Sequence, residues 1–419
     1  MLDATHATDR PGAAETRAAV TPVEREPHAG ALPVATAGRP RGTLMLLAAS
    51  AGLGAANLYY AQPLAAKIAE DFHTTASGVS SALVGTQLGY AAGMLLLVPL
   101  GDVRERRAVI VVTALAAACA LLGFAAAPSL PLLAAASVAV GLCSSLTQMM
   151  VPFAVGLAPP EDRGRVVGAV MSGLLTGVLL SRTVSGTLAT VPWIGWRGVF
   201  VVAAGVMVGL AVVLRVALPA AAPVERLPYR ALLGSLAAIV RREPVLRRRC
   251  AVGALSFASF SMFWSTIAFQ VTQGPIRGGS ATAGLLGALG VTGIVIAPLA
   301  GRLAMRVPPV RVNVGALAIA ALAFAVFAAC PGSLVGIGLG VVLLDAGAQA
   351  NMLANQTVIY GLAPGERSRI NALYMVSYFL GGALGTAIAA QAWQRGGWTA
   401  VCAAGAGLSL VAMLPLRRG

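Results

Sequence analysis

The sequence predicts an all-α membrane protein whose twelve transmembrane helices form two pseudo-symmetric bundles of six. Hydrophobic residues make up 58% of the 419 residues and charged residues only 11%, and the mean hydropathy is +0.81. Apolar runs of roughly 20 residues, the length that crosses a hydrocarbon layer about 30 Å thick, recur along almost the whole chain. The second half of the chain also repeats motifs of the first half. This composition excludes a soluble globular domain.

Clusters of Gly, Pro and charged residues separate the apolar runs and define the predicted spans. The first bundle, 43–218, contains spans at 43–66, 78–100, 108–127, 131–156, 164–190 and 196–218. The second bundle, 249–419, contains spans at 249–271, 280–301, 311–329, 333–360, 368–391 and 397–415. Residues 1–42 are rich in Pro, Ala, Arg and Glu and contain no apolar run, which predicts a disordered cytoplasmic tail.

Basic residues predict the orientation, because Lys and Arg near the ends of spans stay on the cytoplasmic side. With both termini in the cytoplasm, most of the 30 basic residues fall in inner segments, among them the cytoplasmic linker 219–248. Within this linker, Tyr229 to Val240 is expected to form an amphipathic helix on the inner membrane surface. The net charge of +15 is therefore a topology signal that attracts anionic lipid, and it does not indicate nucleic-acid binding.

Two pairs of motifs show that the halves are repeats of one design. LAPPEDRGR at 157–165 matches LAPGERSR at 362–369, and GWRGVFVVAAG at 195–205 matches GWTAVCAAGAG at 397–407. Small residues are spaced four apart in the fifth and eleventh spans, at Gly173, Gly177, Ser181 and Ser185 and at Ser377, Gly381, Gly385 and Ala389. Such stripes predict close helix packing, and repeated units are typical of secondary transporters.

The two sets of six spans, the basic central linker and the inner-loop motif VPLGDVRERR at 98–107 resemble the major facilitator superfamily. The segment ANLYYAQPLAAKIAEDF at 56–72 is similar to bacterial efflux members of its drug:proton antiporter branch. The resemblance covers about residues 43–418 and implies the major facilitator fold. The chain departs from the antiporter pattern at Ser137, where the family has a fourth-span arginine, and at Val178, where it has a proline.

The inner-loop motif of the family implies a conformational latch between the second and third spans. Asp102 takes the position of the family's acid, and Arg106 and Arg107 take the positions of its terminal basic pair. Asp102 can pair with an arginine or lie at a helix N-terminus in one transport state and be released in the other. The alternative is an ordinary charged loop that marks the cytoplasmic side.

Two charges of opposite sign are predicted deep in the membrane. Asp345 lies about 18 Å from the outer end of the tenth span, and Arg182 lies about 14 Å from the outer end of the fifth. An ion at the bilayer centre costs roughly 2.5–3.5 kcal/mol, so each is expected to face a partner or a watery cavity. In the superfamily fold the tenth span lines the central cavity and the fifth flanks it, which implies that Arg182 can approach Asp345.

We interpret Asp345 as the proton-coupling site and Arg182 as its switchable counter-ion or as an anchor for a substrate anion. Alternatively, Arg182 extends to the headgroups and Asp345 is a structural hydrogen-bonding group. Further polar residues on the spans that line the cavity are candidates for substrate contacts: Asn57, Tyr60, Gln62, Gln148, Trp264, Gln349 and Asn351. Each of these is equally compatible with an interhelical hydrogen bond.

Together these features predict a secondary active transporter that exports small organic molecules, drugs or metabolites, in exchange for protons by alternating access. Proton-coupled uptake is the nearest alternative, because the sequence predicts orientation and not the direction of flux. A multi-span membrane sensor or enzyme is a less favoured alternative. The five cysteines and three histidines are scattered, which predicts no catalytic cluster, no metal and no cofactor. We expect a monomer in the inner (cytoplasmic) membrane, with membrane lipids, a small-molecule substrate and protons as partners.

Overall fold

The computed structural model describes residues 41–220, 228–290, 307–363 and 366–418, and within these ranges the regular structure is helical. The first half contains α1 (Arg41–Ala56), α2 (Ala65–Asp71), α3 (Ala76–Val103), α4 (Arg106–Ala126), α5 (Leu130–Ser144), α6 (Leu146–Gly156), α7 (Arg163–Leu188) and α8 (Gly195–Ala217). The second half contains α9 (Tyr229–Arg242), α10 (Pro244–Gln273), α11 (Ser280–Ala288), α13 (Pro309–Ala329), α14 (Leu334–Ile359) and α15 (Arg367–Val411).

Nine stretches of helix in the described part of the chain are long and apolar enough to cross a membrane, which confirms the all-helical membrane fold. One of them, α15, covers both the eleventh and the twelfth predicted spans. It changes direction at Gly396 and Gly397, where the backbone leaves the helical conformation. The later part of the eighth predicted span, 291–301, lies outside the described residues.

The first predicted span is not continuous. The apolar run predicts a helix over 43–66, but α1 ends at Ala56, and residues 57–64 form successive turns before α2 begins. Backbone N–H groups in these turns donate to carbonyls three residues earlier, from Tyr59 to Ala56 and from Gln62 to Tyr59. Pro63 has no N–H to continue a helix. Interrupted spans of this kind place polar groups at the binding sites of transporters.

The internal repeat is present in the backbone conformation. Gly195 and Gly397 begin the two matching GW motifs, and their φ angles are +56° and +58°. Positive φ is the left-handed region, which glycine adopts without a steric penalty. The two glycines therefore make the same turn at the start of the sixth and the twelfth spans.

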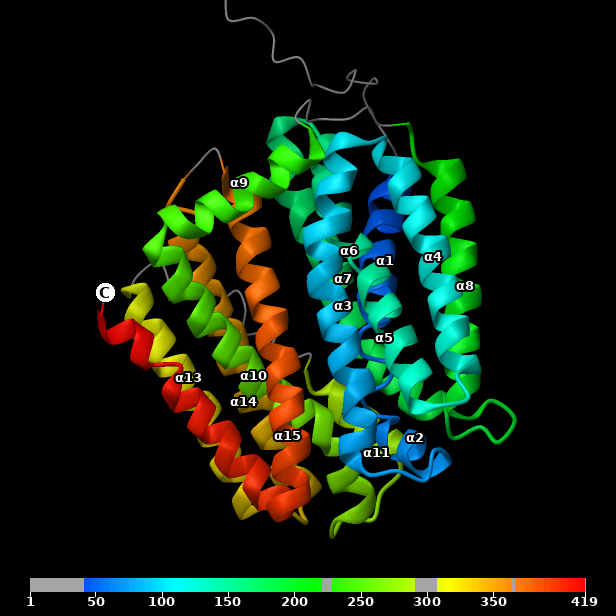
Figure 1. The fold of residues 1–419 in the computed structure, drawn as a ribbon, viewed down its shortest axis with the longest axis vertical. Helices are drawn as coiled ribbons and strands as arrows, with labels where there is room; N and C mark the ends of the chain where they lie inside the picture. The colour runs from blue at the N-terminus through cyan, green and yellow to red at the C-terminus, as the bar shows by residue number, and fades with distance from the viewer. Residues whose placement is uncertain (1–40, 221–227, 291–306, 364–365, 419) are drawn as a thin grey trace, which may run out of the picture. The chain divides into compact units, whose positions relative to one another are not determined.

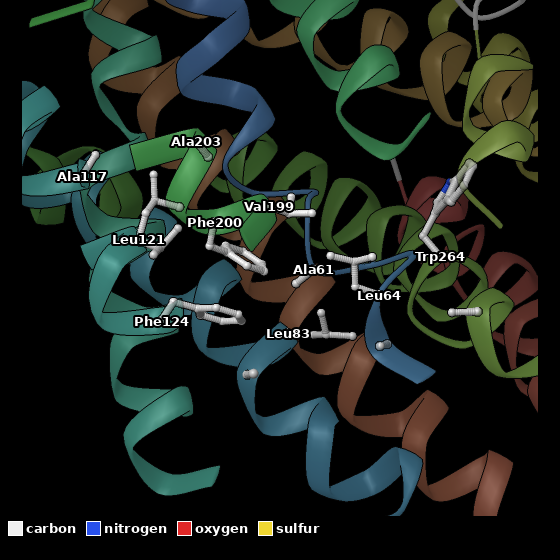
Figure 2. Close-up of a cluster of buried hydrophobic side chains, with 14 of the residues drawn as sticks. Ala61, Leu64, Leu83, Ala117, Leu121, Phe124, Val199, Phe200, Ala203 and Trp264 are labelled. Atoms are coloured by element: carbon white, nitrogen blue, oxygen red, sulfur yellow. The ribbon is translucent and has the colours of Figure 1, made fainter. Parts of the chain in front are cut away.

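The tryptophans that follow these glycines pack in the same way in the two halves. The ring of Trp196 lies edge-on to Phe124 of α4, with ring centroids 6.2 Å apart. The ring of Trp398 lies edge-on to Phe327 of α13, with centroids 6.0 Å apart. Figure 2 shows Phe124 beside Phe200 in the buried cluster between α4 and α8, where their centroids are 4.1 Å apart.

The predicted small-residue stripes pack helices closely within each half. A Cβ atom added to Gly177 of α7 would overlap the carbonyl oxygen of Gly52 in α1. A Cβ atom added to Gly385 of α15 would overlap the carbonyl oxygen of Ala258 in α10. The pairs α1–α7 and α10–α15 are thus equivalent backbone contacts of the repeat.

Helix α9 joins the two halves at one end of the bundles, where it crosses the ends of the spanning helices (Figure 1). Its first residue, Tyr229, donates from its hydroxyl to the carbonyl oxygen of Leu96 in α3 at 2.8 Å. At its other end, Arg242 forms an ion pair with Glu366, next to the start of α15. Leu232, Leu236 and Ile239 are its buried residues, as expected of an amphipathic helix.

Hydrogen bonds join the halves directly at mid-height and at the end away from α9. In α7, Thr183 donates to the carbonyl oxygen of Gly284 in α11 at 3.0 Å. The other bonds of this kind are Ser280 to the Gly186 carbonyl at 3.0 Å, Gln87 to Thr386 at 2.9 Å and Gln394 to Thr75 at 3.1 Å. These hydrogen bonds accompany a close contact between the halves, where Gly186 of α7 and Gly284 of α11 meet.

The glycine contacts generate a stability prediction. Gly177→Ala places a methyl group against the Gly52 carbonyl and should destabilise the protein by about 1–3 kcal/mol, the usual cost of overpacking. Gly209→Ala in α8 is the matched control, because a Cβ there meets nothing within 4 Å. The unfolding temperatures of the two purified variants test this. Equal unfolding temperatures would contradict the close α1–α7 contact.

Candidate functional site

Arg182 lies between the two halves of the protein. It is 2% exposed, near the end of α7 that is away from α9. A Cβ atom at Gly287 of α11 would stand 2.7 Å from the Cβ of Arg182, and one at Gly284 would overlap the Arg182 carbonyl oxygen. The absence of side chains at these two positions lets α11 approach the backbone of α7 at the arginine.

Three side chains surround the guanidinium group, and we call them with Arg182 the arginine box. Nε of Arg182 donates to Oε1 of Gln62 at 2.8 Å. The guanidinium carbon lies 4.6 Å from the ring centre of Tyr59 and 4.0 Å from that of Trp264, both within cation–π range. Nη2 of Arg182 is buried and has no hydrogen-bond partner among the described residues.

The arginine box is assembled from three separate segments. Tyr59 and Gln62 come from the turns that interrupt the first span. Trp264 comes from α10 in the second half and is 1% exposed. Its ring is held edge-on against Phe263, with centroids 5.1 Å apart. Two of the predicted cavity residues, Gln62 and Trp264, therefore both contact Arg182.

Asp345 lies in α14, close to the arginine box but not bonded to it. Among the acidic residues whose side chains the structure describes, it is the one that is buried, at 8% exposure. A Cβ atom at Gly290 would stand 3.0 Å from its Oδ2, so Asp345 and Arg182 flank the same stretch, 287–290. Each group acts electrostatically on the other. No ion pair or hydrogen bond joins them in this conformation of the described chain.

A small cavity lies beside the arginine box. Its volume is about 10 Å³, which is room for one water molecule. Gln87 of α3 lines it with one unpaired side-chain oxygen, while its amide nitrogen donates to Thr386 of α15 across the two halves. The lining residues are Leu58, Tyr59, Gln62, Leu83, Gln87, Phe257, Phe260, Ser261 and Phe379. The sequence analysis did not identify Gln87 as a cavity residue, because in the sequence it is a single amide within an apolar run.

The other predicted cavity residues make no hydrogen bond to Arg182 in the described structure. Asn57 is 3% exposed, and its side-chain nitrogen is unpaired within the described structure. Gln148 donates to the hydroxyl of Tyr90 at 2.8 Å, an interhelical hydrogen bond of the kind given as the alternative. Tyr60 and Gln349 are half-buried. Among the described residues, no group of three or more His, Cys, Asp and Glu side chains could hold a metal ion.

Asn351 belongs to a different polar cluster, inside the second half. It is wholly buried, and its side-chain oxygen accepts from Nδ2 of Asn313 in α13 at 2.7 Å. Oδ1 of Asn313 in turn accepts from Nη1 of Arg249 at 2.6 Å. Arg249 also donates to Asn355, whose amide donates to the Tyr374 hydroxyl. This cluster joins α10, α13, α14 and α15, which makes it a structural network.

Arg249 is a third buried charge that the sequence analysis missed. It ends the run RRR at 247–249, and the prediction counted it with the cytoplasmic basic residues, at the first position of the seventh span. The helix instead begins at Pro244, a residue favoured in the first helical turn. The longer helix carries Arg249 into the bundle, where it is 9% exposed.

The predicted latch is only partly described. The side chain of Asp102 lies outside the residues whose side chains the structure describes. Arg106 donates from Nε to the carbonyl oxygen of Gly101 at 3.1 Å, and Arg107 donates from Nη1 to that of Leu218 at 3.1 Å. Both arginines thus bind backbone carbonyls of the first half at the α9 end of the protein.

Comparison with known proteins finds a transporter family and relatives that are described as transporters. The family profile described as Major Facilitator Superfamily matches residues 44–352. The putative uncharacterized transporter YgaY of Escherichia coli K12 is 41% identical over 376 residues, which cover 90% of this chain and 95% of that protein. The probable transporter SCO4007 of Streptomyces coelicolor is 36% identical over 392 residues, 93% of this chain and 90% of that protein.

A solved structure supports the same fold. The bacterial homologue of the human lysosomal transporter Spinster, in an inward-facing and occupied conformation, superimposes with a TM-score of 0.68 at 17% identity. The match covers 91% of this chain and 95% of that one. At this identity the likeness concerns the fold alone.

The Arg249 network generates a second stability prediction. Asn313→Leu leaves a buried guanidinium and Asn351 without their shortest hydrogen bonds and should cost about 1–3 kcal/mol or more. Asn371→Leu is the control, because Asn371 is half-buried and accepts from Tyr360 near the end of α14. A loss of thermal stability in Asn313→Leu no larger than in Asn371→Leu would contradict the structural role of the network.

Proposed function

This chain belongs to the Major Facilitator Superfamily, and we propose that it moves small organic molecules across the membrane by alternating access coupled to protons, with Asp345 as the proton-carrying group. A transporter of this type rocks one half against the other around a site between them. Arg182 and Asp345 come from different halves and flank the stretch 287–290 at the end of α11, which supports a site at this place.

The observation that carries this proposal is the carboxyl group of Asp345, which is buried and has no ion pair or hydrogen bond among the described residues. Burial favours the neutral form of a carboxyl group, and a nearby positive charge favours the ionised form. Movement of the halves changes both the burial of Asp345 and its distance from Arg182. A group whose proton affinity changes with conformation can bind a proton on one side of the membrane and release it on the other.

Export in exchange for protons is the first candidate direction. The similarity of residues 56–72 to efflux-type members of the superfamily supports it. In this scheme the substrate and the proton compete for Asp345, so that each leaves when the other binds. Drugs and metabolites with a moderately apolar body are the expected substrates, because aromatic side chains line the cavity beside the arginine box.

Uptake of a solute together with a proton is the second candidate, and one observation favours it. Arg182 has aromatic rings and an amide for partners, and its Nη2 lacks an acceptor in the described structure. A substrate that carries a negative charge would supply that acceptor, and it would bind more readily once Asp345 is neutral.

The latch and the membrane orientation belong to the same proposal. We assign Asp102, Arg106 and Arg107 to a latch at the cytoplasmic end. The chain then works as a monomer in the inner membrane, with both termini in the cytoplasm. The basic residues on the α9 side support this orientation.

Asp345→Asn tests the coupling role. The variant should lose uphill transport driven by an imposed pH gradient in proteoliposomes, because an amide cannot carry a proton. It should retain counterflow of labelled substrate, which needs alternating access but no proton movement. The substrate for this assay comes from a thermal-shift screen of the purified protein.

The control for Asp345→Asn is Asp71→Asn, in α2 at the end away from α9. Asp71 pairs with Arg197 at 3.0 Å and is more than a third exposed, so its loss should leave pH-driven transport intact. Normal uphill transport by Asp345→Asn would end the proposal that this residue carries the coupled proton.

A further inference from the structure

We infer that Arg182 is an anion-binding subsite that takes the carboxylate group of an organic substrate. This inference deepens the second candidate function, uptake of a solute together with a proton, and only its proton-coupling consequence rests on that function. Two buried donors carry it, because Nη2 of Arg182 and Nε1 of Trp264 have no acceptor among the described residues. Their side chains are 2% and 1% exposed. A buried donor without an acceptor costs free energy, which an acceptor on a ligand would restore.

Arg197, elsewhere in the same chain, shows what the arginine box lacks. Its guanidinium carbon also lies over an aromatic ring, 4.4 Å from the ring centre of Trp196. Its Nη2 donates to Oδ2 of Asp71 at 3.0 Å, so an acid of the chain completes the site. Arg182 has equivalent aromatic contacts, but the neutral amide of Gln62 stands where an acid would balance its charge. A carboxylate that balances the charge of Arg182, as Asp71 does for Arg197, would therefore come from a ligand.

The acidic residues near Arg182 in the chain do not supply that carboxylate. Asp345 lies beside Gly290 and makes no ion pair with Arg182 in the described structure. Residues 291–306, which follow directly, contain no Asp or Glu. A carboxylate suits the site because a guanidinium group presents several N–H donors to two oxygens at once.

The neighbouring residues indicate the rest of the ligand. Tyr59 and Gln62 belong both to the arginine box and to the lining of the small cavity, which continues to Phe257 and Phe260. An apolar or aromatic body attached to the carboxylate would contact these rings. The present cavity of about 10 Å³ admits a water molecule, so the organic body enters when the halves separate.

The position of the subsite predicts how anion and proton affect each other. Besides each other, the titratable groups that interact electrostatically with Arg182 and Asp345 in the described structure are the hydroxyls of Tyr59, from the interrupted span, and of Tyr378 in α15. Neither is a second acid or a second base at neutral pH. An anion on Arg182 repels ionised Asp345 and is not repelled by protonated Asp345, so proton and anion should strengthen each other's binding.

A matched pair of ligands tests the subsite in the purified full-length protein. The probes are benzoate, hexanoate and 3-phenylpropanoate, each compared with its primary amide, which has the same shape and no charge. At least one carboxylate should raise the unfolding temperature while its amide does not. Stabilisation by neither member of any pair, or equal stabilisation by acid and amide, would overturn the subsite.

Variants then locate the effect. Arg182→Gln should weaken carboxylate binding on the order of tenfold to a hundredfold, and Arg182→Lys should weaken it less, since it keeps the charge without the planar fork. Gln62→Glu places an acid within reach of the guanidinium and should also abolish the effect, even if Arg182→Gln folds poorly. Arg197→Gln is the control and should bind normally. Carboxylate binding that survives both Arg182→Gln and Gln62→Glu would overturn the proposal.

A pH series separates the subsite from the coupling role of Asp345. Between about pH 6 and pH 8 the probes are ionised, so their own titration contributes little. Carboxylate binding should be stronger at the lower pH in the unmodified protein and equally strong at both in Asp345→Asn. Binding that depends on Arg182 but not on pH or Asp345 would support the subsite and refute the proton-carrying role.

Discussion

A positive charge inside an apolar bundle needs compensation, and the neighbourhood of Arg182 is organised by that need. Two aromatic faces and one amide oxygen share the guanidinium group. They reach it only because the first span stops being helical after Ala56, and because α10 of the other half brings Trp264 across. The compensation is incomplete, since one nitrogen of the guanidinium has no acceptor in the described structure. That incompleteness distinguishes a site that can receive a ligand from a finished structural contact.

Two kinds of contact hold the helices together: close backbone contacts at glycines and hydrogen bonds from side chains. Within each half, backbone meets backbone at glycines such as Gly177 and Gly385, where little can slide without a clash. Between the halves, side chains such as Thr183 and Gln87 donate single hydrogen bonds, and the backbones of α7 and α11 also meet closely at Gly186 and Gly284. The halves are therefore joined by hydrogen bonds together with a close glycine contact between α7 and α11, which is where a rocking motion would have to begin.

The two fully embedded arginines of the described chain show that burial alone does not mark a functional charge. Arg249 donates to the amide oxygens of Asn313 and Asn355, which are on helices of its own half. Arg182 has partners in both halves, Gln62 and Tyr59 in the first and Trp264 in the second. Sequence reasoning found Arg182 because it interrupts a long apolar run. It missed Arg249 because that residue ends a basic run, which reads as a loop.

Hydropathy and repetition alone determined the helical membrane fold and its two related halves, and they identified Arg182 and Asp345 as charges within apolar runs, because each depends on the order of apolar and charged residues along the chain. Tertiary structure alone decided which groups meet. The turns at 57–64 lie inside an apolar run that also predicts a helix, so the sequence could not place Gln62 beside Arg182. The contact with Trp264 joins residues far apart in the chain, and its geometry follows from how α7 and α11 meet at glycines. Deep charges can be recognised in a sequence, whereas the partner that a charge lacks becomes visible only in three dimensions.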